Sequence, residues 1–144
     1  MTPKARAEKV VETMMEHDKA SNWLGIEVQE TDEGRAVLTL EVKEHHLNGH
    51  YICHGGFIFT LADSAFAFAC NSYNQNAVAQ TNDITFVAPG RLGDILTATC
   101  EEQSRTGRSG VYDAKVTNQN GDIIALMRGR SRTIKGQHFE EETT

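Results

Sequence analysis

The longest apolar stretch of the chain runs from Phe57 to Cys70 (FIFTLADSAFAFAC) and constrains the fold more than any other feature. It is too short to span a bilayer, and Thr60, Asp63 and Ser64 interrupt it. A helix from Gly56 to Asn71 would be about 24 Å long. Since such a helix is apolar on nearly every side, the rest of the chain must surround it.

The segments on either side of this helix predict strands. From Gly25 to Val42 we expect two strands joined by a hairpin turn at Asp32-Glu33-Gly34, because apolar and polar residues alternate from Ala36 to Lys43. Four more strands follow the helix, separated by short turns rich in Gly, Asn and Pro: 77–88, 94–104, 109–118 and 122–134. Short turns favour antiparallel neighbours. We therefore expect an α+β fold in which a curved antiparallel sheet wraps around one long central helix.

The chain reads as one domain over residues 1–144, because no Ser- or Gly-rich linker divides it. Within the N-terminal segment 1–22, residues 4–20 predict an additional amphipathic helix with Val10 and Met14 on its apolar side. Residues 135–144 are expected to form a disordered tail.

Composition excludes several classes of function. The formal net charge of -6 argues against nucleic acid and against an anionic membrane surface as the main partner. Three scattered cysteines do not form a disulfide framework, and the charged N-terminus does not resemble a signal peptide. We expect a cytoplasmic protein.

The polar positions of the central helix are Thr60, Asp63, Ser64 and Asn71, with the small Ala67 between them. Their spacing places them on one narrow stripe. Asp63 is thus expected at a surface or a seam of the helix and not in the core. A carboxylate there is either satisfied by neighbouring donors or has a chemical role.

The start of the helix favours the chemical role. Glycines at positions 55 and 56 let a ligand approach the free N–H groups of the first turn, which can stabilise a developing oxyanion. Gly55 and Asp63 are, however, about 12 Å apart along the helix, too far to act on one carbonyl carbon. We therefore expect the active site to lie between two subunits, with Gly55 from one and Asp63 from the other.

Other readings of the polar residues are weaker. His45, His46, His50, Cys53 and His54 match no metal-ligand spacing, so no metal is expected, and His45 and His46 are expected to be solvated. Ser64 lacks the surrounding motif of a hydrolase nucleophile, and it either bonds its own helix or lines the pocket.

Arginines in the last strand alternate with Met127, Gly129 and Ser131, so Arg128, Arg130 and Arg132 share one face. They either pair with acids on the next strand or contact phosphate groups, helped by Arg91, Arg105 or Arg108. Both interpretations stay open.

The run LNGHYICHGG followed by LADSAFAFACN resembles the hotdog-fold thioesterases of the phenylacetic acid degradation (PaaI) family. The likeness continues through DITFVAPG (83–90), Gly93-Asp94 and 110–113. It covers most of the chain.

This resemblance implies hydrolysis of an aromatic acyl-CoA thioester such as phenylacetyl-CoA or a hydroxyphenylacetyl-CoA. It gives Asp63 the role of nucleophile or general base and the Gly55 N–H that of carbonyl donor, with Asn48 and His54 in the same pocket. Gly56, Phe57 and Ser64 are expected to contact the substrate, with Arg91, Arg105, Arg108 and Arg128 as candidates for the CoA phosphates. The family assembles as dimers that pair into homotetramers, and CoA is part of the substrate, so no cofactor is implied.

Two alternatives to the thioesterase remain. A non-catalytic acyl-CoA-binding module could use the same groove, although a binding site gains nothing from a desolvated carboxylate. A hotdog dehydratase or hydratase is the weaker alternative, because the HFPG loop of the dehydratases is absent.

Overall fold

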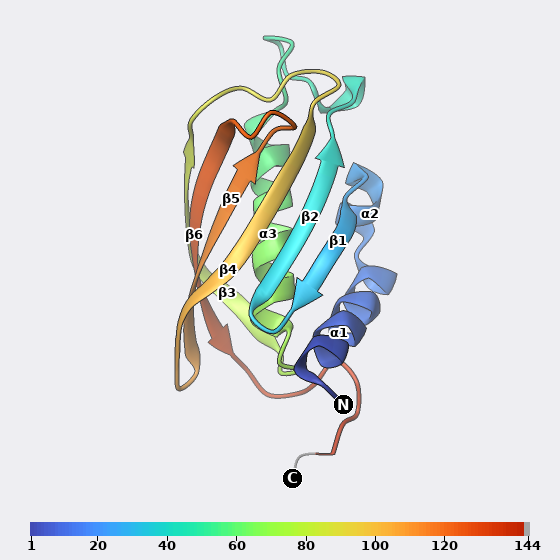
Figure 1. Cartoon of the computed structure of the whole chain (residues 1–144), viewed down its shortest axis with the longest axis vertical. Helices are drawn as coiled ribbons and strands as arrows, with labels where there is room; N and C mark the ends of the chain where they lie inside the picture. Colours follow the sequence, from blue (N-terminus) through green and yellow to red (C-terminus); the bar gives the residue numbers. More distant parts are fainter. Residues whose placement is uncertain (143–144) are drawn as a thin grey trace.

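The protein is a six-stranded antiparallel sheet curved around one long helix, as the computed structural model of residues 1–142 shows (Figure 1). The expected α+β hotdog architecture is confirmed. The elements, in chain order, are α1 (Pro3–His17), α2 (Lys19–Leu24), β1 (Glu27–Asp32), β2 (Arg35–Glu41), the short 3-10 helix η1 (Glu44–His46), α3 (Gly55–Asn71), β3 (Ala77–Phe86), β4 (Ile95–Thr106), β5 (Ser109–Thr117) and β6 (Ile123–Thr133).

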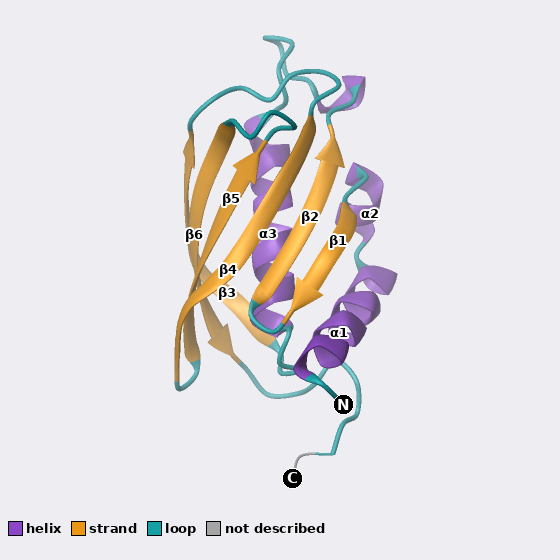
Figure 2. Cartoon of the chain, in the orientation of Figure 1, coloured by secondary structure: helices purple, strands orange, loops and turns teal. Residues whose placement is uncertain are grey.

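The strand order in the sheet is β1-β2-β4-β5-β6-β3. Short turns explain why β1 pairs with β2, β4 with β5 and β5 with β6, whereas β3 crosses over to pair with β6. Strands β1 and β3 therefore form the two edges of the sheet. In Figure 2 the purple α3 lies behind the orange strands, so the sheet covers one side of the helix.

Helix α3 supplies the centre of the core. Leu61, Ala62, Ala65 and Phe66 are buried against β2, β4 and β5. Burial of each large apolar side chain stabilises the fold by about 1.5–3 kcal/mol. No helix within residues 1–142 is both long and apolar enough to cross a membrane.

The N-terminal segment forms two helices and not the single expected one. Asp18 interrupts it: its side chain accepts a hydrogen bond from the Ser21 N–H at 2.9 Å and so caps α2. Helix α1 buries Val10 as expected and packs against β1 and α3, while α2 turns toward α3. Hydrophobic periodicity alone does not show that the Asp18 side chain caps a second helix.

The C-terminal segment also differs from the expected disordered tail. Arg6 and Glu141 form an ion pair at 2.7 Å, Asn74 donates a hydrogen bond to the Phe139 carbonyl oxygen, and Lys9 lies over the Phe139 ring. These contacts hold the segment against α1 and the end of α3. Residues 143–144 of the predicted tail lie outside the described residues.

Candidate active site

Helix α3 begins with a free backbone donor. His54 has an extended backbone (φ -59°, ψ 131°), and its Nδ1 accepts a hydrogen bond from the Gly56 N–H at 2.9 Å. The amides of Phe57 and Ile58 donate to the His54 carbonyl oxygen. The Gly55 N–H forms no hydrogen bond within the described part of the chain, and it lies at the positive end of the helix dipole. The first turn therefore presents one donor to any group that binds at this end of the helix.

The loop before α3 orients a second donor, the Asn48 amide. Asn48 Oδ1 accepts hydrogen bonds from the N–H groups of His50 (2.9 Å) and Ile52 (3.3 Å). Because Oδ1 is engaged, the Nδ2 group points the other way, and it has no acceptor among residues 1–142. The left-handed Tyr51 (φ 60°) closes this tight loop.

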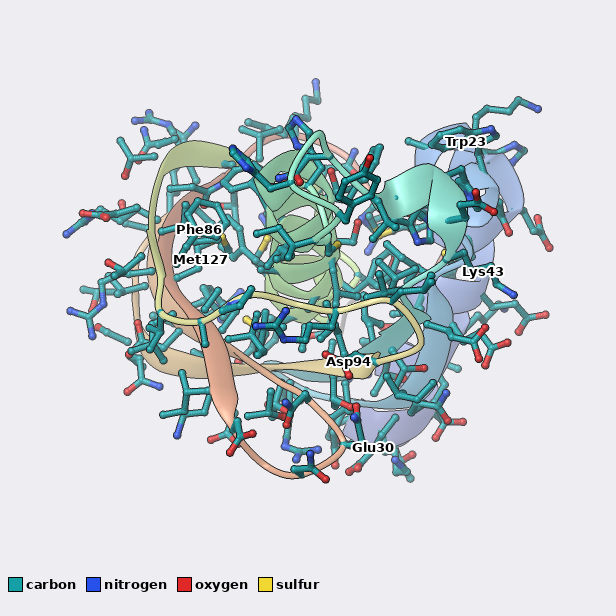
Figure 3. All side chains as sticks on the ribbon, turned by 90° about the horizontal axis from the view of Figure 1, so that it is seen from above. Trp23, Glu30, Lys43, Phe86, Asp94 and Met127 are labelled. Atoms are coloured by element: carbon teal, nitrogen blue, oxygen red, sulfur yellow. The ribbon has the colours of Figure 1, made fainter. Side chains whose placement is uncertain are left out.

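Both donors line a cavity of about 430 Å³ next to the start of α3. Its walls are mostly apolar and consist of Asn48, Ile52, Cys53, Gly55, Ile58, Phe86, Val87, Ala88 and Pro89. Phe86 lies beside the N-terminal end of α3, with Trp23 on the opposite side of that end (Figure 3). A Cβ atom at position 55 would lie 3.2 Å from the Phe86 ring, so glycine is what allows the ring to pack this closely against the donor.

Asp63 lies two turns further along α3, in a half-buried position at the seam with β3. Its Oδ1 accepts a hydrogen bond from Asn82 Nδ2 at 2.8 Å. Burial raises the pKa of the Asp63 carboxyl above its ordinary value, and the Asn82 hydrogen bond opposes this shift. The expectation that Asp63 lies at a seam agrees with this position.

One chain does not bring the acid and the donors together. Asp63 does not line the cavity, and eight residues of helix separate it from Gly55, about 12 Å along the axis. A site that uses both groups needs a second copy of the chain.

The other expected substrate contacts lie around the first turns of α3. Gly56 is held by His54, and Phe57 packs between the rings of His46, His54 and Trp23. Ser64 turns away from Asp63: its Oγ lies 3.0 Å from Ser21 Oγ on α2. The predicted polar stripe is therefore split, and its last member, Asn71, is buried and bonds to Ala77 at the start of β3.

The prediction that His46 is solvated is wrong, whereas His45 is exposed. His46 Nδ1 accepts a hydrogen bond from the Lys43 N–H, so Nε2 carries the proton of the neutral ring and donates it to the Leu24 carbonyl oxygen at 3.0 Å. Burial lowers the pKa of His46. Within residues 1–142 no three His, Cys, Asp or Glu side chains gather in a way that could hold a metal ion.

The arginines fall into different surroundings. Arg128 forms a bidentate pair with Asp113 (2.7 and 2.9 Å) on the outer face of the sheet, beside a hollow of about 640 Å³ that neither Asp63 nor Gly55 lines. Arg105 lies over the Tyr73 ring, and Arg108 donates to the Thr133 carbonyl oxygen, both at the β4–β5 turn. Arg91 follows Pro89 of the cavity wall and is exposed. Of these four arginines, Arg91 is the one close in sequence to a residue of the cavity wall in the same chain.

The comparisons with known proteins agree with this geometry. Residues 50–125, which include Gly55, Asp63 and Asn82, match the thioesterase superfamily. The chain is 47% identical to the acyl-coenzyme A thioesterase PaaI of Escherichia coli K12, over 85% of this chain and 88% of that protein. The chain belongs to the thioesterase superfamily.

Solved structures support the same assignment. The E. coli PaaI protein from the phenylacetic acid degradation operon superposes with a TM-score of 0.93 and 43% identity, over 94% of this chain and 99% of that chain. A Streptococcus mutans protein bound to acetyl-CoA gives a TM-score of 0.75 at 26% identity, over 78% of this chain and 91% of that chain. The protein is thus a thioester hydrolase of the PaaI type with the hotdog fold.

Sequence reasoning missed the hydrogen-bond partner of Asp63, Asn82. It lies on β3, far from α3 in the sequence, in a segment whose alternation is broken by a bulge between Ala79 and Thr81. No local pattern marks it as a partner of Asp63.

The raised pKa of Asp63 has a consequence for stability. The folded state binds the Asp63 proton more tightly than the unfolded state does, so ionisation lowers stability as the pH rises through the folded pKa. Asp63→Asn removes this charge and can still accept the Asn82 hydrogen bond. We expect its melting temperature at mildly alkaline pH to be higher than that of the wild type by roughly 2–4 °C.

Differential scanning calorimetry over a pH series measures this difference, which should shrink as the pH falls through the pKa of Asp63. Asp83→Asn on the exposed side of β3 is the control and should change little at any pH. A wild type that is as stable as Asp63→Asn at alkaline pH would show that the carboxylate is not desolvated.

Proposed function

We propose that the protein hydrolyses aromatic acyl-CoA thioesters, of the phenylacetyl or hydroxyphenylacetyl type, to the free acid and CoA. The observation that carries the proposal is the free Gly55 N–H at the head of α3, beside the free Asn48 amide in an apolar cavity. The E. coli relative is named as an acyl-coenzyme A thioesterase, and its solved structure comes from a phenylacetic acid degradation operon. The reaction needs no cofactor, since CoA belongs to the substrate.

The two donors suit the carbonyl oxygen of the thioester. In the tetrahedral intermediate this oxygen carries a negative charge, which the Gly55 N–H and the helix dipole stabilise. Asn48 Nδ2 is available as a second donor, and His54 keeps the first turn open by capping Gly56. The carbonyl is thereby polarised toward attack.

Asp63 supplies the base or the nucleophile. As a base it takes a proton from water while the oxygen of that water adds to the carbonyl carbon; the intermediate then expels the CoA thiolate, which takes up a proton. As a nucleophile its oxygen adds to the carbonyl carbon directly, the C–S bond breaks to expel the CoA thiolate, which takes up a proton, and water hydrolyses the resulting anhydride to the free acid and the Asp63 carboxylate. Both routes use the ionised carboxylate.

The complete site belongs to two subunits in this proposal. Strand β3 is an edge of the sheet with unpaired backbone groups, and Asp63 faces that strand through Asn82. Val78, Phe86 and Val87 on and just beyond β3 are exposed apolar residues, as expected for a surface that a second copy covers. We propose a homodimer along this edge, with pairs of dimers forming a tetramer.

The cavity wall favours an aromatic acyl group. Phe86, Ile52, Ile58 and Pro89 offer flat and branched apolar surfaces, whereas Phe66 and Phe68 are buried in the core and do not line the cavity. For the CoA phosphates we propose Arg91, with Arg105 and Arg108 as candidates from the partner subunit. Arg128 already pairs with the Asp113 carboxylate and is therefore a poor phosphate ligand.

A panel of aryl, hydroxyaryl and straight-chain acyl-CoA esters tests the substrate class. We expect kcat/KM for the aryl esters to be higher by about tenfold, and Asp63→Asn to lower kcat for every ester by at least about 100-fold. Release of CoA thiol over many turnovers is the measurement. Preference for straight chains would contradict the aromatic assignment, and undiminished turnover by Asp63→Asn would contradict the proposed role of the acid.

The Gly55 N–H can be removed with little change of the backbone. Proline is tolerated at the first position of a helix, and the extended backbone of His54 suits a residue before proline. We expect Gly55→Pro to lower kcat by about 100-fold or more, because it lacks the oxyanion donor. Gly55→Ala retains the N–H and places a similar Cβ against Phe86, so it is the matched control. Equal losses in the two variants would show that crowding, and not the missing donor, causes the effect.

Mixed dimers test the shared site. Asp63→Asn subunits and Gly55→Pro subunits are each inactive alone, but a dimer of one of each contains one intact site. Random mixing should therefore restore about a quarter of the wild-type activity in the whole mixture, and the mixed dimers isolated from it should have about half. Coexpression of the two variants with different affinity tags, followed by assay of the doubly tagged fraction, measures this. A mixed dimer without activity would place the acid and the donor in the same subunit.

A further inference from the structure

We propose that Asn82 is the positioning residue for the Asp63 carboxylate, and that Gly129 on β6 makes the space in which Asn82 can do this. The proposal rests on the proposed function, in which Asp63 reacts with water or with the thioester. It assigns a role to a pair of residues that lies outside the cavity at the start of α3.

Asn82 makes the side-chain hydrogen bond to Asp63. Its Nδ2 donates to Oδ1 at 2.8 Å, and no hydrogen bond of Oδ2 is formed within residues 1–142. One oxygen is therefore held, which fixes the plane of the carboxylate, and the other stays available for reaction. A neutral amide suits this task, since it orients the carboxylate without the full charge neutralisation that an arginine or lysine would bring.

The orientation of the Asn82 amide costs folding free energy, and its hydrogen bond to Asp63 explains why this orientation is adopted. Asn82 Oδ1 is buried and has no hydrogen-bond partner in the described part of the chain. An unsatisfied buried acceptor costs about 1–3 kcal/mol. The opposite orientation would place Oδ1 against the carboxylate oxygen, where two acceptors repel each other. The orientation with Nδ2 toward Asp63 is thus the one that an ionised carboxylate favours.

Gly129 makes this arrangement sterically possible. It is the cross-strand partner of Asn82 in the β3–β6 pair. A Cβ atom at position 129 would lie 2.8 Å from Asn82 Oδ1 and 2.7 Å from the Phe66 ring, closer than real Cβ contacts allow. A side chain there would require the Asn82 amide, the Phe66 ring or both to move.

The bulge in β3 directs Asn82 toward α3. Side chains alternate between the two faces of a strand, so Ala77, Ala79 and Thr81 would share one face of a regular strand. The bulge between Ala79 and Thr81 shifts this phase, and Asn82 becomes half-buried while Thr81 is exposed. The bulge therefore turns the Asn82 side chain toward α3 and Asp63.

The charged groups around α3 do not pair with Asp63, whose side-chain partner is Asn82. Burial raises the pKa of the Cys70 thiol on the same helix, and the Asp63 carboxylate adds to this shift. Charged side chains on the elements packed against α3 make contacts elsewhere. In the N-terminal segment these are Arg6 with Glu141, Lys4 with Glu8, and Asp18 with Ser21. In the sheet they are Arg35 with Glu30 and Glu101, Glu102 with Tyr112, and Arg128 with Asp113, while Asp83 and Arg130 are exposed. No ion pair with Asp63 is formed within residues 1–142.

The test is the pH dependence of the Asn82→Ala variant. Loss of the hydrogen bond should move the acid limb of the kcat/KM profile to higher pH, so that activity at a pH on this limb falls by about tenfold. On the alkaline plateau the loss should be smaller, and KM should stay unchanged, because Asn82 does not line the cavity proposed for the acyl group. Asn82→Asp has the same shape but opposes ionisation of Asp63, and it should move the limb further. Thr85→Ala on the exposed side of β3 is the control and should keep the wild-type profile.

A second readout does not depend on activity. In protein labelled with ¹³C at the aspartate carboxyls, the Asp63 signal is identified by its loss in Asp63→Asn, and its titration should move to higher pH in Asn82→Ala. Unchanged titration and an unchanged acid limb in a folded Asn82→Ala would overturn the proposal. Should Asp63→Asn itself be fully active, the proposed function fails, but the titration still decides whether Asn82 controls the carboxylate.

Discussion

Burial of α3 is the constraint on which the rest of the structure depends. The helix is apolar on nearly all sides, and the curved sheet covers Leu61, Ala65 and Phe66 with β2, β4 and β5. A helix enclosed in this way has few positions at which a polar side chain is tolerated. Its first turn, and the seam with β3, are where the enclosure ends. The free Gly55 N–H and the Asp63 carboxylate lie at these two places.

The same constraint explains the cost of the site. The Asp63 carboxyl is half-buried, where burial raises its pKa, and Asn82 Oδ1 has no hydrogen-bond partner within residues 1–142 while Nδ2 faces the carboxylate. Neither feature stabilises the fold, and both suit a carboxylate that must react. Stability that is lost at a reactive group is a common feature of enzyme sites. The well-packed core around Phe66 and Leu61 offsets this loss.

Much of the fold could be predicted from local patterns. The alternation from Ala36 to Lys43 and the Gly, Asn and Pro turns located the hairpin and the four later strands to within a few residues of their observed ends. The errors came from contacts that a pattern does not contain. The Asp18 cap divides the N-terminal helix, the Leu24 carbonyl binds a buried His46, and Arg6 holds the C-terminal segment through Glu141. Each depends on a partner that the periodicity does not show.

The sequence by itself determined the central helix, its glycine start and the distance between Gly55 and Asp63, because helix geometry is local and converts residue spacing directly into length. From that distance alone it required a second subunit for a joint site. The tertiary structure decided which groups complete the two halves. Phe86 reaches Gly55, the loop orients the Asn48 amide, and the β3 bulge with the β3–β6 register aligns Asn82 between Gly129 and Asp63. These contacts join residues from separate strands and loops, and strand register is set by the packing of the whole sheet and not by any short segment.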